Sequence, residues 1–121
     1  MSESRRLLQV DSDDVVRDQT ATVVREATAF EYEGVSTAQA ALSRLSSSTF
    51  DCVVTAARLP ERDGVALLDS IRAEHDDVAV GFCDDVSDPT VPASALNRGA
   101  DGYVHRDEED WPQEFLERVH D

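Results

Sequence analysis

The stretch FDCVVTAARLPERDG, residues 50–64, decides the fold. It opens with an apolar, β-branched run, Cys52 to Ala56, of the kind found in strands that are buried on both faces of a parallel sheet. Pro60 then marks a loop, and a helix is expected to begin near Asp63. In open parallel sheets, ligands bind at the carboxyl ends of the strands. The last residue of this strand, Ala56, therefore lies where a functional site is expected.

The rest of the chain alternates further strand and helix patterns. Apolar β-branched runs predict strands, and apolar residues at helical spacing predict helices. The predicted strands are 6–10, 29–32, 52–56, 78–83 and 103–105, and the predicted helices are 14–28, 36 or 37 to 48, 63–74, 89–98 and 111–120. This alternation predicts a single α/β domain over residues 1–121, with a five-stranded parallel sheet and helices on both faces.

The composition is strongly acidic. The chain has 26 Asp and Glu residues against 11 basic residues, all of them Arg, and a formal net charge of −15. Such a charge argues against binding to nucleic acid through its phosphates. Because the carboxylates are scattered along the chain, the composition is typical of a protein that stays soluble in strong salt, as in a halophilic archaeon.

Other sequence features limit the possible locations and cofactors. The first residues are polar and the apolar run after them is short, so we expect a cytoplasmic protein without a membrane span. Cys52 and Cys83 are expected on neighbouring strands at heights that differ by on the order of 13 Å, which is beyond disulfide reach. The three histidines lack the spacing of a zinc site, and no phosphate-binding glycine loop follows the first strand.

The pattern around the central strand resembles response-regulator receiver domains. In that family, an aspartate four residues before a proline accepts a phosphoryl group, and an Asp-Gly pair opens the next helix. Pro60 and Asp63-Gly64 match, but Ala56 occupies the acceptor position. An acidic turn at 11–14 and the sequence GADGYV at 99–104 extend the likeness from residue 7 to about residue 119. The resemblance implies a flavodoxin-like sheet with strand order 2-1-3-4-5.

The resemblance also implies five site positions, of which only one is intact. Receivers use two acidic residues that bind Mg²⁺, the acceptor aspartate, a hydroxyl residue after strand four and a lysine after strand five. Asp11 matches the first position, whereas Ser12, Ala56, Asp84 and Arg106 occupy the other four. We expect Arg106 to act as an internal cation paired with Asp84 and Asp11, because a planar guanidinium suits carboxylates. An exposed loop position for Arg106 is the alternative.

This degenerate site predicts no catalytic residue and no bound cofactor. Asp11 and Asp13 are candidates for residual Mg²⁺ binding, although residues such as Asp13 more often cap the following helix. One alternative is a receiver that still binds Mg²⁺ and is phosphorylated at a non-standard residue such as Asp84. Another is a small α/β enzyme that uses Asp11, Asp84 and Arg106 on a metabolite. The chain is expected not to be an enzyme.

With the phosphorylation site degenerate, the remaining candidate for a functional feature is a protein-interaction surface. In receivers, the face formed by helix four, strand five and helix five transmits the signal, and Tyr103 matches its aromatic position. Ala95, Trp111 and Phe115 are expected around Tyr103, unless Trp111 and Phe115 only close the core. The resemblance thus implies a degenerate receiver of a two-component phosphorelay, acting as a phosphorylation-independent interaction module. Its expected partners are a histidine kinase, a transducer, an attached output domain or a second copy of the chain.

Overall fold

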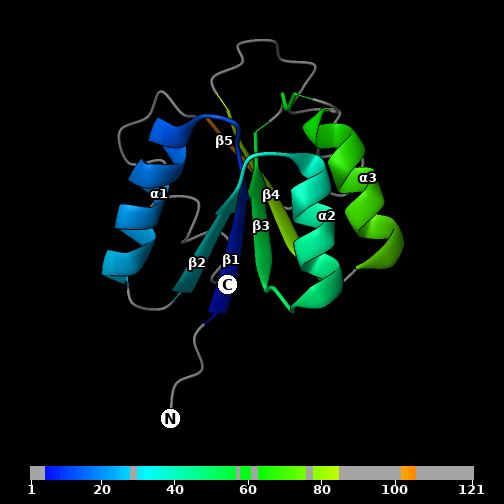
Figure 1. Ribbon diagram of the computed structural model, residues 1–121, viewed down its shortest axis with the longest axis horizontal. Coiled ribbons are helices and arrows are strands. Elements are labelled where there is room, and N and C mark those ends of the chain that lie inside the picture. The colour runs from blue at the N-terminus through cyan, green and yellow to red at the C-terminus, as the bar shows by residue number, and fades with distance from the viewer. Residues whose placement is uncertain are drawn as a thin grey trace.

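The structure is a computed structural model that describes residues 5–27, 30–56, 58–60, 63–75, 78–84 and 102–105; for 27, 30, 83, 84 and 102–105 it describes the backbone. Helices and strands alternate along these residues (Figure 1). They are β1 (Arg5–Val10), α1 (Asp14–Ala27), β2 (Phe30–Val35), α2 (Ala38–Ser47), β3 (Cys52–Thr55), α3 (Gly64–Glu74), β4 (Ala79–Asp84) and β5 (Gly102–His105). The helices predicted at 89–98 and 111–120 lie outside the described residues.

The strands form a parallel sheet in the order β2-β1-β3-β4-β5. In Figure 1, α1 lies on one side of the sheet, and α2 and α3 lie together on the other. The predicted α/β architecture with a parallel sheet is therefore confirmed. β3 occupies the middle of this sheet, and all four of its residues are buried. This explains why its sequence is apolar without alternation.

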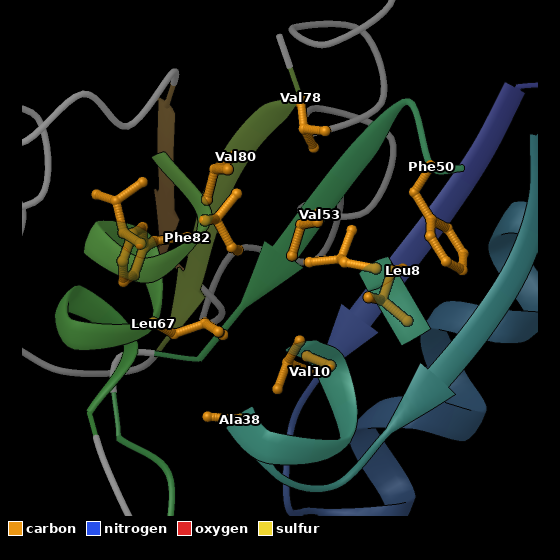
Figure 2. Packing of buried hydrophobic residues seen from close by; sticks show 13 residues of the cluster. Leu8, Val10, Ala38, Phe50, Val53, Leu67, Val78, Val80 and Phe82 are labelled. Carbon is orange, nitrogen blue, oxygen red and sulfur yellow. The ribbon is translucent and has the colours of Figure 1, made fainter. Parts of the chain in front are cut away.

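Two hydrophobic clusters cover the two faces of the sheet. Successive side chains of a strand point to opposite faces, so the neighbouring residues of β3 divide between the clusters. Val53 packs in the larger cluster with residues of α2 and α3, whereas Cys52 and Val54 pack with α1 residues such as Val24. Figure 2 shows the larger cluster, which contains the fully buried Phe82 of β4. Both faces of the central strands thus depend on helix packing.

The second strand differs most from the prediction. It was expected over 29–32 but runs from Phe30 to Val35 and pairs with β1 over six positions. It lies at the edge of the sheet, where outward-facing residues need not be apolar. Its glutamates interrupt the apolar pattern, so periodicity alone ended the strand too early. β3 starts at Cys52 as predicted but ends one residue earlier, at Thr55, and β4 is shifted by one residue, to Ala79–Asp84.

The helix starts agree with the cap residues in the sequence. Thr37, one of two predicted caps, accepts a hydrogen bond from the Ala40 amide at 3.1 Å. Asp63 accepts one from the Ala66 amide at 2.7 Å, so α3 begins one residue later, at Gly64. Each side chain satisfies an amide that lacks a partner within its helix.

The register between β3 and β4 separates the two cysteines as predicted. Cys52 is level with Ala79, so Cys83 lies four residues further along β4. Cys52 is a free, buried thiol, and burial raises its pKa to about 12, with a smaller contribution from Asp51. Over the described residues, every helix is too short or too polar to cross a bilayer.

Candidate functional site

The carboxyl ends of the central strands carry three of the predicted site positions. Asp11 follows β1, Ala56 follows β3, and Asp84 ends β4. The Ala56 amide donates to the Val10 carbonyl at 3.0 Å, which extends the pairing of β3 with β1 up to the site. Because β3 lies between β1 and β4, Asp11 and Asp84 follow strands on either side of Ala56. The fold thus collects these three positions at one edge of the sheet.

Ala56 is enclosed by the start of α3. The residue is 5 % exposed. A Cβ atom placed on Gly64 would lie 2.3 Å from the Ala56 carbonyl oxygen and 2.8 Å from Cε2 of Phe82. Only glycine allows α3 to begin this close to the end of β3, which explains the Asp-Gly pair in the sequence. The side chain that should carry the acceptor oxygen is a buried methyl group.

Thr55 does not replace the missing acceptor. Its hydroxyl donates to the Ala56 carbonyl oxygen at 2.9 Å, and the residue is 1 % exposed. Adjacent strand residues point to opposite faces of a sheet, so Thr55 and Ala56 diverge. A buried hydroxyl that is already bonded to the backbone has no route to a phosphodonor.

The acidic turn after β1 is held by its own side chains. Asp11 is 4 % exposed, and its Oδ1 atom accepts from the Asp13 amide at 2.9 Å. Asp13 in turn accepts from the Val15 amide at 2.9 Å and caps α1. Ser12, at the second acidic position, is exposed. Of the two roles considered for Asp13, metal ligand and helix cap, its contact in the structure is that of a helix cap.

Arg17 contacts the acidic turn, and the sequence analysis did not name it. Its Nη1 atom donates to the Asp11 carbonyl oxygen at 2.6 Å, and its Nη2 atom forms an ion pair with Asp14. The only sequence signal is the three-residue spacing between Asp14 and Arg17 on one helix face. This contact places a cation of α1 beside the acidic turn.

A buried polar network connects this turn to the edge strand. The Tyr32 hydroxyl hydrogen-bonds Oε1 of Gln9 at 2.5 Å and the Arg17 carbonyl oxygen at 3.2 Å. Gln9 also donates to the Thr20 hydroxyl at 2.9 Å, and Gln9 and Thr20 are 1 % and 2 % exposed. Burial raises the pKa of Tyr32 to about 12, although nearby Arg17 opposes this shift. The network links β1, α1 and β2 directly beneath the site.

The described residues do not fit a receiver magnesium site. Mg²⁺ prefers an octahedron of oxygen ligands that includes one or two carboxylates. The side chain of Ala56 carries no oxygen, Ser12 offers a neutral hydroxyl, and the capping oxygen of Asp13 is bonded to an amide. No group of three metal-binding side chains occurs within the part of the chain that is described. Among the side-chain ligand positions that the family resemblance implies, Asp11 alone carries a carboxylate.

The other predicted site residues have no described side chain. The backbone of Tyr103 pairs with Phe82, and that of Asp84 pairs with His105. Arg106, Ala95, Trp111 and Phe115 lie outside the described residues. The proposed pairing of Arg106 with Asp84 therefore stays a prediction, as does the signalling surface around Tyr103.

Several solved structures of receiver domains have a fold similar to that of this chain. The signal receiver domain of an HD domain-containing protein from Pseudomonas fluorescens Pf-5 is 26 % identical, with a TM-score of 0.86 over 98 % of this chain and 93 % of that one. A CheY-like receiver domain protein from Methanospirillum hungatei JF-1 is 24 % identical, with a TM-score of 0.87 over 98 % and 92 %. The chemotaxis regulator CheY4 of Vibrio cholerae is 18 % identical, with a TM-score of 0.85 over 97 % and 99 %.

No curated protein matches the chain closely enough to count as a relative. The family assignment rests instead on the sequence profile described as "Response regulator receiver domain", which matches residues 7–119. That range includes every described strand except the first two residues of β1. The chain therefore belongs to the response regulator receiver domain family.

Proposed function

We propose that this chain is a degenerate receiver domain that signals by binding and not by accepting a phosphoryl group. The single observation that carries the proposal is Ala56, whose buried methyl group stands at the acceptor position. Phosphoryl transfer to a receiver needs a carboxylate oxygen there as nucleophile. Without that oxygen, the remaining residues have no phosphoryl group to stabilise.

The contacts of the neighbouring residues support this proposal. Asp11 and Asp13 form the turn and cap α1, and Arg17 bonds the backbone of the turn. Each of these polar groups stabilises local structure. We extend the proposal to Arg106, which would pair with Asp84 and replace the charge that Mg²⁺ supplies in phosphorylated receivers.

The proposed output is a protein contact. We place it on the face around Tyr103, with Ala95, Trp111 and Phe115. A histidine kinase, a transducer, an attached output domain or a second copy of the chain would be the partner. The similar receiver domain from Pseudomonas fluorescens belongs to an HD domain-containing protein, which supports an attached output domain as one partner class. Binding would have to favour one conformer for the contact to carry a signal.

Thermal unfolding with Mg²⁺ and beryllofluoride, a phosphoryl mimic, tests the proposal. A ligand that binds only the folded state raises the melting temperature by mass action. We expect the wild-type melting temperature to be the same with both additives as without them, after correction for ionic strength. A saturable rise in the wild type would contradict the proposal.

A matched variant shows that the assay detects a competent site. The double variant Ser12→Asp with Ala56→Asp restores the second acidic residue and the acceptor carboxylate. We expect Mg²⁺ to raise the melting temperature of this variant, because the two substitutions place carboxylates next to Asp11. A rise in the variant with none in the wild type supports the proposal.

A further inference from the structure

Asp11, the first residue of the acidic turn, is held through its amide, its side chain and its carbonyl group. The amide donates to the Val35 carbonyl oxygen of β2 at 3.0 Å. The Oδ1 atom accepts from the Asp13 amide at 2.9 Å. The carbonyl oxygen accepts from Nη1 of Arg17 at 2.6 Å. Of these three contacts, the last has a charged donor, and hydrogen bonds from charged donors are the stronger ones.

The Arg17 side chain reaches from α1 to this turn and is largely shielded from solvent. It is 21 % exposed, whereas Asp14, with which its Nη2 atom forms an ion pair, is 84 % exposed. Exposed ion pairs of residues three positions apart on a helix contribute little to stability. The shielded bond to the Asp11 carbonyl oxygen is therefore expected to matter more for the turn than the ion pair does.

Gly34 of β2 leaves the space that the Arg17 side chain occupies. In Figure 1, α1 lies beside β2, the edge strand of the sheet. A Cβ atom on Gly34 would lie 3.2 Å from Cδ of Arg17 and 2.5 Å from the Tyr32 hydroxyl oxygen. Both distances are shorter than the optimal separation of non-bonded atoms. Any other residue at position 34 would have to displace one of these two side chains.

The Tyr32 hydroxyl holds the part of α1 that carries Arg17. It lies 3.2 Å from the Arg17 carbonyl oxygen and 2.5 Å from Oε1 of Gln9. Gln9 also donates to the Thr20 hydroxyl at 2.9 Å. α1 is thus bonded to β2 at Arg17 and to β1 at Thr20, and such a satisfied buried network makes the local structure rigid. The Arg17 side chain therefore starts from a fixed position.

We propose that Arg17 is a built-in latch that holds the acidic turn, residues 11–14, in one conformation, and that Tyr32 and Gly34 position it. The guanidinium supplies a positive charge from within the chain beside the carboxylates of the turn. A partner that contacts the edge of the sheet around Ala56 meets a turn that is already ordered, so less entropy is lost on binding. The latch does not depend on whether the chain accepts a phosphoryl group.

Hydrogen exchange of the Asp13 amide, expressed as a protection factor, tests the latch. This amide is bonded within the turn, so it exchanges when the turn opens. We expect Arg17→Met to lower the protection factor about tenfold, the effect of losing one hydrogen bond from a charged donor. Arg17→Lys should lower it too, because an ammonium lacks the planar fork that contacts the carbonyl oxygen and Asp14 together. Wild-type protection in either variant would overturn the proposal.

The variant Asp14→Asn separates the latch from the exposed ion pair. It removes the charge of Asp14 and leaves the bond from Arg17 to the Asp11 carbonyl oxygen. Protection of the Asp13 amide should stay within about twofold of the wild type, since exposed ion pairs contribute little. A loss as large as that in Arg17→Met would show that the ion pair holds the turn, which would overturn the proposal.

The variant Gly34→Ala tests whether β2 positions the latch. The added methyl group should displace Arg17 or Tyr32, so protection of the Asp13 amide should fall although Arg17 is present. The Ala56 amide, which is bonded to β1 at 3.0 Å, is the control for the fold and should keep its protection in all variants. Wild-type protection of Asp13 in Gly34→Ala would contradict the positioning role. Equal losses at Asp13 and Ala56 would show that the whole fold opens and would overturn a local latch.

Discussion

Gly64 shows how a single missing side chain positions the site. Its Cα lies so close to the end of β3 that an added Cβ would meet the Ala56 carbonyl oxygen at 2.3 Å. Gly64→Ala should therefore destabilise the fold by about 1–3 kcal/mol, the usual cost of overpacking a core. Urea unfolding measures this loss. A Gly64→Ala variant as stable as the wild type would contradict this explanation.

The Tyr32 side chain predicts how the stability of the fold depends on pH. Its pKa is raised from 10.0 to about 12, mainly because the phenol is partly buried. The folded state thus favours the neutral phenol, so this contribution to stability is complete below pH 10 and is lost as the pH rises through 12. In a Tyr103→Phe background, Tyr32 is the only tyrosine. Ultraviolet titration should then show no tyrosinate at pH 10.5, and ionisation near pH 10 would contradict the buried network.

The site could be predicted from the sequence only in part. The places of Asp11 and Ala56 at the ends of two strands could be predicted, because strand ends and motif spacing can be recognised from consecutive residues. Arg17 and Tyr32 were missed, since their contacts join three elements and leave no periodic pattern in the chain. The three-residue spacing between Asp14 and Arg17 on one helix face is the only signal in the sequence, and it gives no sign of the bond from Arg17 to the turn.

At the level of helices and strands, burial determined how accurately the bounds of each strand could be predicted. The apolar runs of β1, β3 and β4 reflect helix cover on both faces, and their positions were predicted to within one residue. β2 lies at the sheet edge, and its predicted end falls three residues too early. Its polar residues make side-chain bonds across elements, which a search for apolar periodicity does not detect.

The contact between Glu33 of β2 and Arg44 of α2 is one such bond, and it predicts a pH effect. Arg44 donates two hydrogen bonds to the Glu33 carboxylate, which lowers the pKa of that carboxyl below 4.5. A lowered folded pKa stabilises the fold above pH 4.5, and the gain is lost as the pH falls through the folded pKa.

Glu33→Gln should therefore be less stable than the wild type at pH 7, and the difference should shrink below pH 4.5. Denaturant unfolding over this pH range measures both effects. Because the pair is partly exposed, added salt should also reduce the difference. Glu31→Gln, whose carboxylate lies 3.9 Å from Arg6, serves as the control and should show a smaller effect. A difference that does not shrink as the pH falls below 4.5 would contradict this role of the ion pair.

Over the whole molecule, the net charge of −15 opposes folding by self-repulsion. The Debye screening length falls from about 10 Å at 0.1 M salt to about 3 Å at 1 M, so added salt weakens this repulsion. The melting temperature, followed by circular dichroism, should rise over this range of KCl. Removing the charge of exposed residues of α1, in Asp18→Asn with Glu26→Gln, should reduce the rise. A melting temperature that does not respond to salt would show that repulsion does not limit stability.

The absence of a phosphoacceptor at Ala56 is the central claim, and intact mass tests it most directly. The wild type and Ala56→Asp are incubated with acetyl phosphate and Mg²⁺ in concentrated KCl, beside a receiver with an intact acceptor aspartate. The wild type should keep its mass while the intact receiver gains one phosphoryl group, and Ala56→Asp shows whether the acceptor was the only missing part. A stable phosphoryl adduct on the wild type, mapped to any residue of this chain, would contradict the account.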